Sequence, residues 1–177
     1  EPFDGGGAGR QWFSVRGISE DNRAERVAAA MPPLEAYVRQ AQARFSLLQS
    51  DTALAGFSQG AIMALELVQA HDGMAGRVIA FSGRYAQLPK AAPQFTTLHL
   101  LHGADDPVMN VSHIQAAHAR LETLHGDSTI DVATHVGHEL PWLFTCASQP
   151  PRPVLPSTGL RPRWRQCWRS RRRAFRA

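Results

Sequence analysis

The chain has 177 residues, 44% of them hydrophobic, which suits one folded domain with a core of two or three layers. No apolar run reaches the roughly 18 residues of a membrane span, and the first residues lack the pattern of a signal peptide. We therefore expect a cytoplasmic protein without stable membrane insertion. Cys146 and Cys167 are too few for a disulfide framework and lack metal-ligand spacing, so we expect reduced thiols and no metal.

Charge is divided unevenly along the chain. The net charge is +4, but residues 1–147 hold ten Lys and Arg against fifteen acids, whereas residues 148–177 hold nine Arg and no acid. The second segment is also rich in proline and has no apolar period, so we predict a folded domain over 1–147 and a disordered tail over 148–177. Trp164 and Trp168 among the tail arginines could bind nucleic acid or an anionic membrane. We favour solvated disorder and expect no nucleic-acid partner.

The amino-terminal part begins with a glycine-rich stretch, which predicts a loop over residues 1–9. Asp21 or Asn22 is predicted to cap a helix whose apolar residues recur at steps of four and three. Pro32 and Pro33 interrupt this stripe. An interior proline costs about 3 kcal/mol, so we expect a kink or a break into two helices. The stripe comprises Val27, Met31, Leu34, Val38, Ala41, Phe45 and Leu48.

The rest of the domain alternates short apolar strands with helices. Strands joined by helices of this length form right-handed crossovers, so the predicted fold class is α/β with a mostly parallel sheet flanked by helices. Ser58, the Asp105-Asp106 pair and His138 each follow a predicted strand, at the edge where such sheets place their active sites. The predicted strands are 52–57, 77–81, 96–102 and 128–136; the helices are 59–70 and one capped by Asn110; and a long loop covers 82–95.

Residues 52–65 have the pattern of a nucleophile elbow: a buried strand, a serine with a glycine two positions away on either side, and an apolar helix. A serine on such a strained turn brings the residues two before and two after it against neighbouring backbone. Both must then be small, and Gly56 and Gly60 meet this need. The pattern therefore predicts Ser58 as a nucleophile.

A serine nucleophile needs a base to take its proton and a carboxylate to orient that base, here in the chain order Ser, Asp, His. Asp105 and Asp106 both stand in place for the acid, and their spacing leaves the choice between them open. Six of the eight histidines lie on or beside predicted helices, or within or at the end of a strand. Of the remaining two, His135 and His138, only His138 lies beyond the strand that follows the acid, so we predict it as the base.

Five motifs in this order resemble the phospholipase/carboxylesterase family, the acyl-protein-thioesterase-like branch of the α/β-hydrolases, and especially its bacterial small esterases. The resemblance covers about residues 8–140. It implies Asp106 as the acid, His138 as the base and the backbone N–H of Gln59 as one oxyanion donor. The motifs are Arg10-x-Trp12-Phe13, Gly56-Phe57-Ser58-Gln59-Gly60-Ala61, Phe81-Ser82-Gly83, His102-Gly103-x-x-Asp106-Pro107-Val108 and Gly137-His138.

The resemblance implies a cofactor-free serine carboxylesterase or thioesterase acting on small acyl esters or thioesters, and leaves a homodimer open. It also implies an amino-terminal strand that pairs with the strand of the nucleophile and ends in a His-Gly-x-Gly loop, which supplies a second oxyanion donor. No such stretch precedes Arg10, and the Arg- and Pro-rich tail stands where the family has a final helix. We therefore expect residues 1–147 to form a partial α/β-hydrolase domain.

These departures define the alternative interpretation. Losing one oxyanion donor typically costs about 10²- to 10³-fold in kcat, and an unpaired apolar strand invites aggregation. The alternative is a truncated, catalytically incompetent module that acts only as an interaction surface or is a non-functional fragment. Three smaller expectations remain: Trp12 and Phe13 pack in the core, loop 82–95 borders the acyl side of the pocket, and Ser14, where many relatives have aspartate, alters only a loop.

Overall fold

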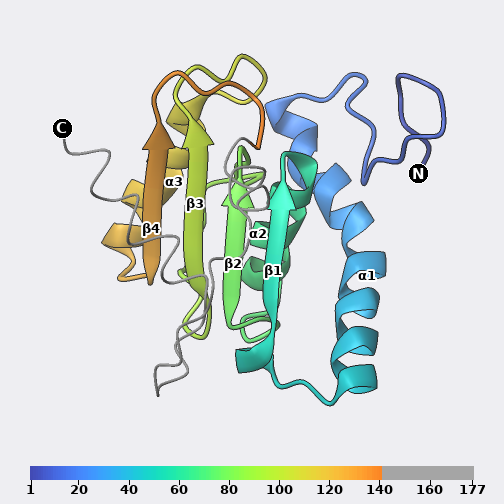
Figure 1. Cartoon of the computed structure of the whole chain (residues 1–177), viewed down its shortest axis with the longest axis vertical. Helices are drawn as coiled ribbons and strands as arrows, with labels where there is room; N and C mark the ends of the chain where they lie inside the picture. The colour runs from blue at the N-terminus through green and yellow to red at the C-terminus, as the bar shows by residue number, and fades with distance from the viewer. Residues whose placement is uncertain (141–177) are drawn as a thin grey trace, which may run out of the picture. The chain divides into compact units, whose positions relative to one another are not determined.

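A computed structural model describes residues 1–140, in which four parallel strands form a sheet with helices packed behind it (Figure 1). The predicted α/β class is confirmed. Residues 141–177, with Cys146, Cys167 and the predicted tail 148–177, lie outside the described residues. The elements are α1 (Glu20–Phe45), the short 3-10 helix η1 (Gln49–Asp51), β1 (Ala53–Phe57), α2 (Gln59–Ala70), β2 (Arg77–Phe81), β3 (Thr97–Gly103), α3 (Val111–Thr123) and β4 (Ser128–Ala133).

The strands lie in the order β1-β2-β3-β4, and every neighbouring pair is parallel. Right-handed crossovers that advance in one direction place their connections on one face of the sheet, and in Figure 1 both α2 and α3 lie on the same side. All four strands therefore end at the same edge, where the predicted site residues follow. Within residues 1–140, β1 pairs with β2 alone and is an edge strand.

Two apolar clusters make up the core. The first fills the space between the sheet and the helices α2 and α3, with Leu65, Val78, Leu100 and Leu121 fully buried. The second lies between α1 and α2. Helix α2 takes part in both clusters, which explains why its sequence is apolar on nearly every face. Members of the second cluster include Phe13, Val27, Met31, Met63 and Leu67.

Helix α1 begins before Asp21 and Asn22, the two residues predicted to cap it. Ser19 is the N-cap residue, and the Asn22 side chain accepts a hydrogen bond from the Ser19 N–H at 2.8 Å. The prediction that Asp21 or Asn22 caps the helix is therefore wrong, because both lie inside its first turn. Asn22 instead acts from the third helical position, where it satisfies a backbone donor that precedes the helix.

The two prolines of α1 do not divide it. Of the two predicted outcomes, the break does not occur, because one helix runs through Pro32 and Pro33. Figure 1 shows the first turns inclined to the rest, in agreement with the predicted kink. Both prolines are exposed, as are Ala28 and Ala29, whose carbonyls lose their helical partners. Because those carbonyls face water, the lost hydrogen bonds cost less than they would in the interior.

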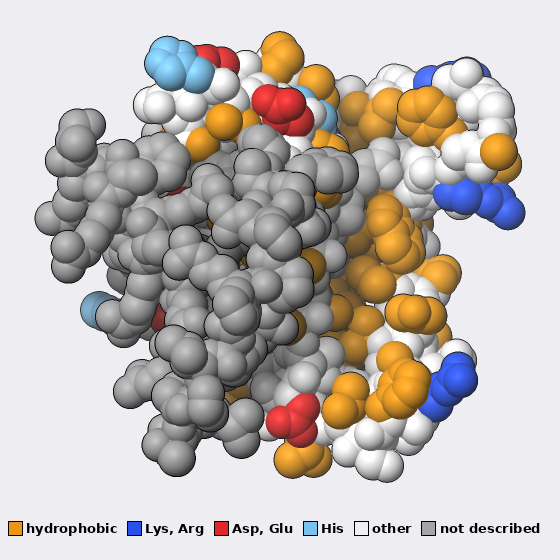
Figure 2. All heavy atoms as spheres, in the orientation of Figure 1, with side chains coloured by type: hydrophobic (Ala, Val, Ile, Leu, Met, Phe, Trp, Pro, Cys, Tyr) orange, Lys and Arg blue, Asp and Glu red, His pale blue; other side chains and the backbone are white. Residues whose placement is uncertain are grey.

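The apolar stripe of α1 is only partly covered. Val27, Met31 and Val38 are buried as predicted, whereas Phe45, the last residue of α1, is 63% exposed. Leu48, which was predicted to continue the stripe, lies beyond the end of the helix and is 69% exposed. Figure 2 shows hydrophobic side chains on the flank formed by α1 and β1. Within the described chain, therefore, the stripe is longer than the surface that covers it.

Candidate active site

The turn between β1 and α2 places Ser58 at the carboxyl edge of the sheet. Ser58 has φ 52° and ψ −116°, so its backbone lies in the strained region expected of a nucleophile elbow. A Cβ on Gly56 would lie 2.3 Å from the carbonyl carbon and oxygen of Gly60, so position 56 accepts only glycine. A Cβ on Gly60 meets nothing within 4 Å in the described chain. Residues 1–140 therefore show no contact that requires a small residue at position 60, and the need for Gly60 stays a prediction.

His138 follows β4 and lies between the serine and an aspartate. Its Nε2 is 3.0 Å from Ser58 Oγ, and its Nδ1 is 2.8 Å from Asp106 Oδ2. A carboxylate only accepts hydrogen bonds, so Nδ1 carries a hydrogen and Nε2 is free to accept from the serine hydroxyl. The Phe57 ring packs against the imidazole with the ring centroids 4.7 Å apart. Three residues from distant parts of the chain thus form one line of hydrogen bonds.

Asp106 follows β3 and has a fully buried side chain. Its Oδ1 accepts the backbone N–H groups of Met109 at 2.8 Å and Val108 at 2.9 Å, which leaves Oδ2 for His138. Burial alone would raise the pKa of Asp106, but the Met109 N–H, the His138 imidazole and the Val108 N–H together hold it below its usual range. This carboxylate is therefore held ionised and aimed.

The neighbouring Asp105 points elsewhere. Its carboxylate is mostly exposed and lies 3.8 Å from Nδ1 of His135, which is itself almost fully exposed. Of the two carboxylates that the spacing left open, Asp106 is the one that contacts His138. Within the sheet, His99 is half-buried, and its Nδ1 lies 3.0 Å from Thr129 Oγ1.

Gly103 brings the ends of β3 and β4 together, a role that the sequence analysis missed. A Cβ at this position would lie 2.2 Å from the carbonyl oxygen of Val136. Two hydrogen bonds join the segments beyond it: the Ala104 N–H donates to Ala133 at 2.8 Å, and the Asp105 N–H donates to Val136 at 3.0 Å. This close crossing carries the chain to His138 above Asp106. A glycine directly after a strand and before the acid is the signal that could have found it.

Gln59 contributes two groups to this region, its backbone N–H and its side-chain amide, and only the first was predicted to matter. As the first residue of α2, it has a backbone N–H with no acceptor in its own helix, which suits the predicted oxyanion donor. Its side chain also fastens an amino-terminal segment to the elbow: Oε1 accepts the Trp12 N–H and Nε2 donates to the Phe13 carbonyl, both at 3.0 Å. Phe13 is 4% exposed and packs in the core as predicted, whereas Trp12 is 40% exposed and does not.

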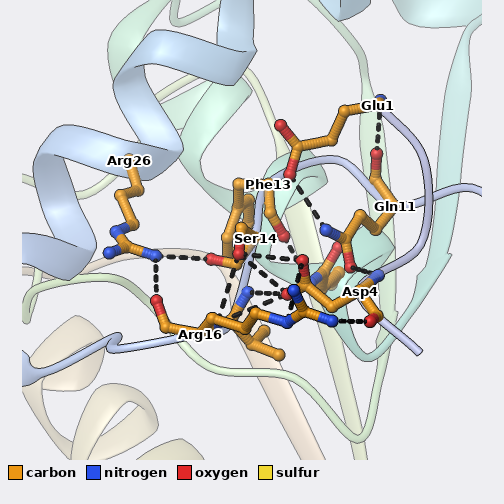
Figure 3. A network of polar contacts seen from close by, with 9 residues as sticks. Glu1, Asp4, Gln11, Phe13, Ser14, Arg16 and Arg26 are labelled. Carbon is orange, nitrogen blue, oxygen red and sulfur yellow. Dashed lines mark hydrogen bonds and ion pairs between the residues drawn. The ribbon is translucent and has the colours of Figure 1, made fainter. Parts of the chain in front are cut away.

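The same amino-terminal segment is held by a polar network around Asp4 (Figure 3). The Asp4 carboxylate accepts the Ser14 hydroxyl and the Val15 N–H, each at 2.8 Å. Hydrogen bonding, with Gln11 as its largest contributor and Ser14 and Val15 adding to it, lowers the pKa of Asp4 to about 2. Arg26 of α1 donates to the Ser14 carbonyl at 2.9 Å. Ser14, which stands where many relatives have aspartate, therefore links Asp4 to Arg26 through hydrogen bonds and holds this loop.

A hollow of about 530 Å³ lies beside the loop after β2. Neither this hollow nor a second one of about 310 Å³ is lined by Ser58 or His138, so the described part gives no support to loop 82–95 bordering an acyl pocket. The wall of the larger hollow includes Arg84. Arg84 binds both carboxylate oxygens of Glu20, at 2.9 and 2.7 Å, and lies 3.2 Å from His113 Nε2. Burial and the Arg84 charge lower the pKa of His113. The lining residues are Glu20, His113, Ala116 and residues 84–88.

The described residues also bear on two other classes of site. Among residues 1–140, no group of three His, Cys, Asp or Glu side chains is arranged to bind a metal ion. No helix in this range is both long enough and apolar enough to cross a membrane.

The sequence profile of the phospholipase/carboxylesterase family matches residues 2–143. The chain belongs to this family. The resemblance inferred from the five motifs is therefore confirmed. A curated member, esterase YpfH from Escherichia coli strain K12, is 52% identical over 136 residues.

Solved structures of related proteins share the fold. The crystal structure of esterase PE8 aligns with a TM-score of 0.71 and 29% identity, over 82% of this chain and 71% of that one. SOBER1 from Arabidopsis thaliana aligns with a TM-score of 0.61 at 23% identity, over 77% of this chain and 70% of that one, and supports the fold alone. The match to esterase YpfH covers 77% of this chain but 59% of that protein, so this chain spans well under two thirds of its relative.

Proposed function

We propose that this chain carries the catalytic residues of a serine carboxylesterase or thioesterase that hydrolyses small acyl esters. The observation that carries the proposal is the line of hydrogen bonds from Ser58 through His138 to Asp106, at 3.0 and 2.8 Å. Family membership and the esterase relatives support the same reaction class. Because this chain spans 59% of esterase YpfH, the activity and substrates of the whole protein are part of the proposal.

In the proposed reaction, Ser58 is the nucleophile. His138 Nε2 takes the hydroxyl proton as Oγ bonds to the carbonyl carbon, and then passes that proton to the alcohol or thiol as the bond to the leaving group breaks. Water repeats the sequence on the acyl-serine, with His138 again as the base, and releases the carboxylic acid. Asp106 stays ionised throughout and stabilises the imidazolium.

The charge on the reacting oxygen would be stabilised by the Gln59 N–H. Donors that are fixed before the reaction are effective because they need no reorganisation. The amino-terminal end of α2 adds a favourable partial positive charge at the same place. Gln59 is itself held by its side-chain bonds to Trp12 and Phe13, so this donor is positioned by two regions of the chain. No cofactor takes part in any step.

The proposal is tested by hydrolysis of a short-chain nitrophenyl ester, with Ser58→Ala as the matched control. We expect turnover by the wild-type chain and only the background rate with the variant. Equal rates for the two would contradict the proposal for this chain. They would instead favour the second candidate, a hydrolase-fold module without catalysis. The specific observation for it is that, among residues 1–140, β1 has a paired strand on one side only.

A further inference from the structure

A second buried histidine lies directly beneath the acid, and the proposed reaction does not use it. His102 is the second-to-last residue of β3, and its side chain is fully buried. Its Nε2 is 2.7 Å from the carbonyl oxygen of Met109. A carbonyl only accepts, so Nε2 carries the hydrogen and donates it. The same nitrogen is 3.5 Å from Asp106 Oδ2, which is too long for a good hydrogen bond.

Met109 is thereby held on both sides. Its N–H donates to Asp106 Oδ1 at 2.8 Å, while its carbonyl accepts from His102. The Val108 N–H donates to the same Oδ1 at 2.9 Å. Residues 106–109 therefore form a small cradle of donors around one carboxylate oxygen, and His102 joins the far end of this cradle to β3. The cradle decides which oxygen of Asp106 remains for His138.

In the described residues, His102 has two polar contacts: the hydrogen bond to the Met109 carbonyl at 2.7 Å and the longer approach to Asp106 Oδ2 at 3.5 Å. His102 Nδ1 is buried and has no hydrogen-bond partner among residues 1–140. A buried polar side chain is costly unless its hydrogen bonds repay the loss of water. The bond to Met109 is therefore the interaction that favours histidine over an apolar side chain here.

We propose that His102 is a positioning residue for Asp106. By holding the Met109 carbonyl, it keeps the Val108 and Met109 N–H groups directed at Asp106 Oδ1, so that Oδ2 faces His138. Its effect on turnover rests on the proposed function, because His102 acts only through Asp106 and touches no reacting atom. A carboxylate that turns by a small amount gives the imidazole a poorer partner, and displacements of about 1 Å can cost about 10²-fold in rate.

Two amide substitutions separate this role from simple core packing. In His102→Gln the side-chain nitrogen can reach the place of Nε2 and donate to Met109, whereas in His102→Asn it reaches only the place of Nδ1. The two variants bury similar polar groups, so they form a matched pair. We expect His102→Asn to lower kcat by about 10²-fold with little change in KM, and His102→Gln to retain most of the activity.

A readout that needs no turnover makes this test independent of the proposed function. The Nδ1 proton of His138, hydrogen-bonded to Asp106, should give a far-downfield proton NMR signal in the wild-type chain, whether or not the chain hydrolyses esters. We expect this signal to persist in His102→Gln and to be weakened or lost in His102→Asn, at a temperature where circular dichroism shows both variants folded. If His102→Asn does not fold, the test rests on His102→Gln: retention of the signal supports the proposal, and its loss in the folded variant overturns it.

The proposal is overturned if both variants keep the wild-type signal and kcat, or if both lose them equally while folded. Absence of the signal from the wild-type chain would also overturn it, since the bond between His138 and Asp106 would then not form. A wild-type chain that shows the signal without ester hydrolysis would contradict the proposed function alone. In that case the comparison of signals still tests the role of His102.

Discussion

Ser58 and Asp106, the proposed nucleophile and acid, follow strands with different numbers of paired neighbours. Ser58 follows β1, which pairs on one side only within residues 1–140, whereas Asp106 follows β3, which has β2 and β4 as neighbours. The Asp106 side chain is fully buried and held by two backbone donors. Ala53 and Ala55 of β1 are exposed. In the sheet that residues 1–140 form, Asp106 therefore follows an interior strand and is deeply held, while Ser58 follows the edge strand β1 and His138 follows β4, the edge strand on the opposite side.

This difference shows which contacts hold each part of the site in place. On the acid side, Gly103 allows the β3 and β4 segments to cross closely, and hydrogen bonds hold them there. On the serine side, the elbow is held by α2, by β2 and by the Gln59 side chain. Substitutions around Asp106 and Gly103 should therefore act mainly on catalysis and stability. Substitutions on the edge strand β1 should act mainly on the association of chains with one another.

The largest effect is expected from Asp106→Asn. The amide keeps the size of the side chain but removes the charge that orients His138 and stabilises its imidazolium, so we expect kcat to fall by about 10⁴-fold. The measurement is the steady-state hydrolysis of a nitrophenyl ester. Asp105→Asn makes the same chemical change at the exposed neighbour and should leave the rate unchanged. Equal losses in the two variants would contradict the assignment.

Gly103→Ala should have the next largest effect. Its Cβ would lie 2.2 Å from the Val136 carbonyl oxygen and 2.6 Å from that of Gly137, so the segment that carries His138 must move. We expect a loss of about 1–3 kcal/mol in the free energy of unfolding and of about 10²-fold in kcat. Chemical denaturation and ester hydrolysis measure the two. Gly60→Ala, whose Cβ meets nothing within 4 Å, is the control for stability and should not lower the free energy of unfolding.

Ala55→Lys tests the margin of the sheet. Within residues 1–140, no strand pairs with the outer edge of β1. An apolar edge of this kind invites strand pairing between molecules, and a lysine on an edge strand opposes such pairing. We expect the wild-type chain to self-associate as its concentration rises and the variant to do so less, as measured by sedimentation velocity. Ala43→Lys adds the same charge to an exposed position of α1 and should not reduce association. Identical behaviour of all three chains would show that this edge does not mediate association.

The smallest effect is expected from the pH dependence of stability. Burial and Arg84 lower the pKa of His113 below 6.5, so as pH falls below 6.5 the unfolded chain binds a proton before the folded chain does. The contribution of His113 is therefore complete above pH 6.5 and is lost at lower pH. His99, with a pKa lowered mainly by burial, acts in the same direction.

Between pH 7 and pH 5, we expect the free energy of unfolding to fall less in His113→Gln than in the wild-type chain. Some decrease should remain in the variant, because His99 is still present. Thermal unfolding at several pH values measures this. The matched control is His125→Gln, at an exposed histidine just beyond the end of α3. A profile for His113→Gln that parallels the wild-type profile would contradict the account of this cluster.

Much of the fold follows from local sequence patterns. The bounds predicted for α2 and β2 agree with the structure, because a helix that is apolar all round and a short β-branched and aromatic run are both distinctive. Asn110 caps α3 as predicted, with its side chain accepting the Ser112 N–H. Ser58, Asp106 and His138 could be placed at one edge because the ends of parallel strands meet there.

The rest depends on contacts between distant residues. The exposure of Phe45 depends on what covers α1, and the position of Leu48 depends on where the helix ends; periodicity reveals neither. The bonds from Gln59 to Trp12 and Phe13 join residues 46 or 47 positions apart. Gly103 looks like any turn glycine until the segment around Val136 is seen against it. A single sequence gives the spacing of such residues but not which of them meet.

Covalent labelling by a fluorophosphonate, followed by intact-mass measurement and peptide mapping, tests most directly whether the serine, imidazole and carboxylate act together. The account predicts one adduct, on Ser58, with labelling abolished in Ser58→Ala and slowed by several orders of magnitude in His138→Ala. An adduct on another serine, or a labelling rate that does not depend on His138, would contradict it.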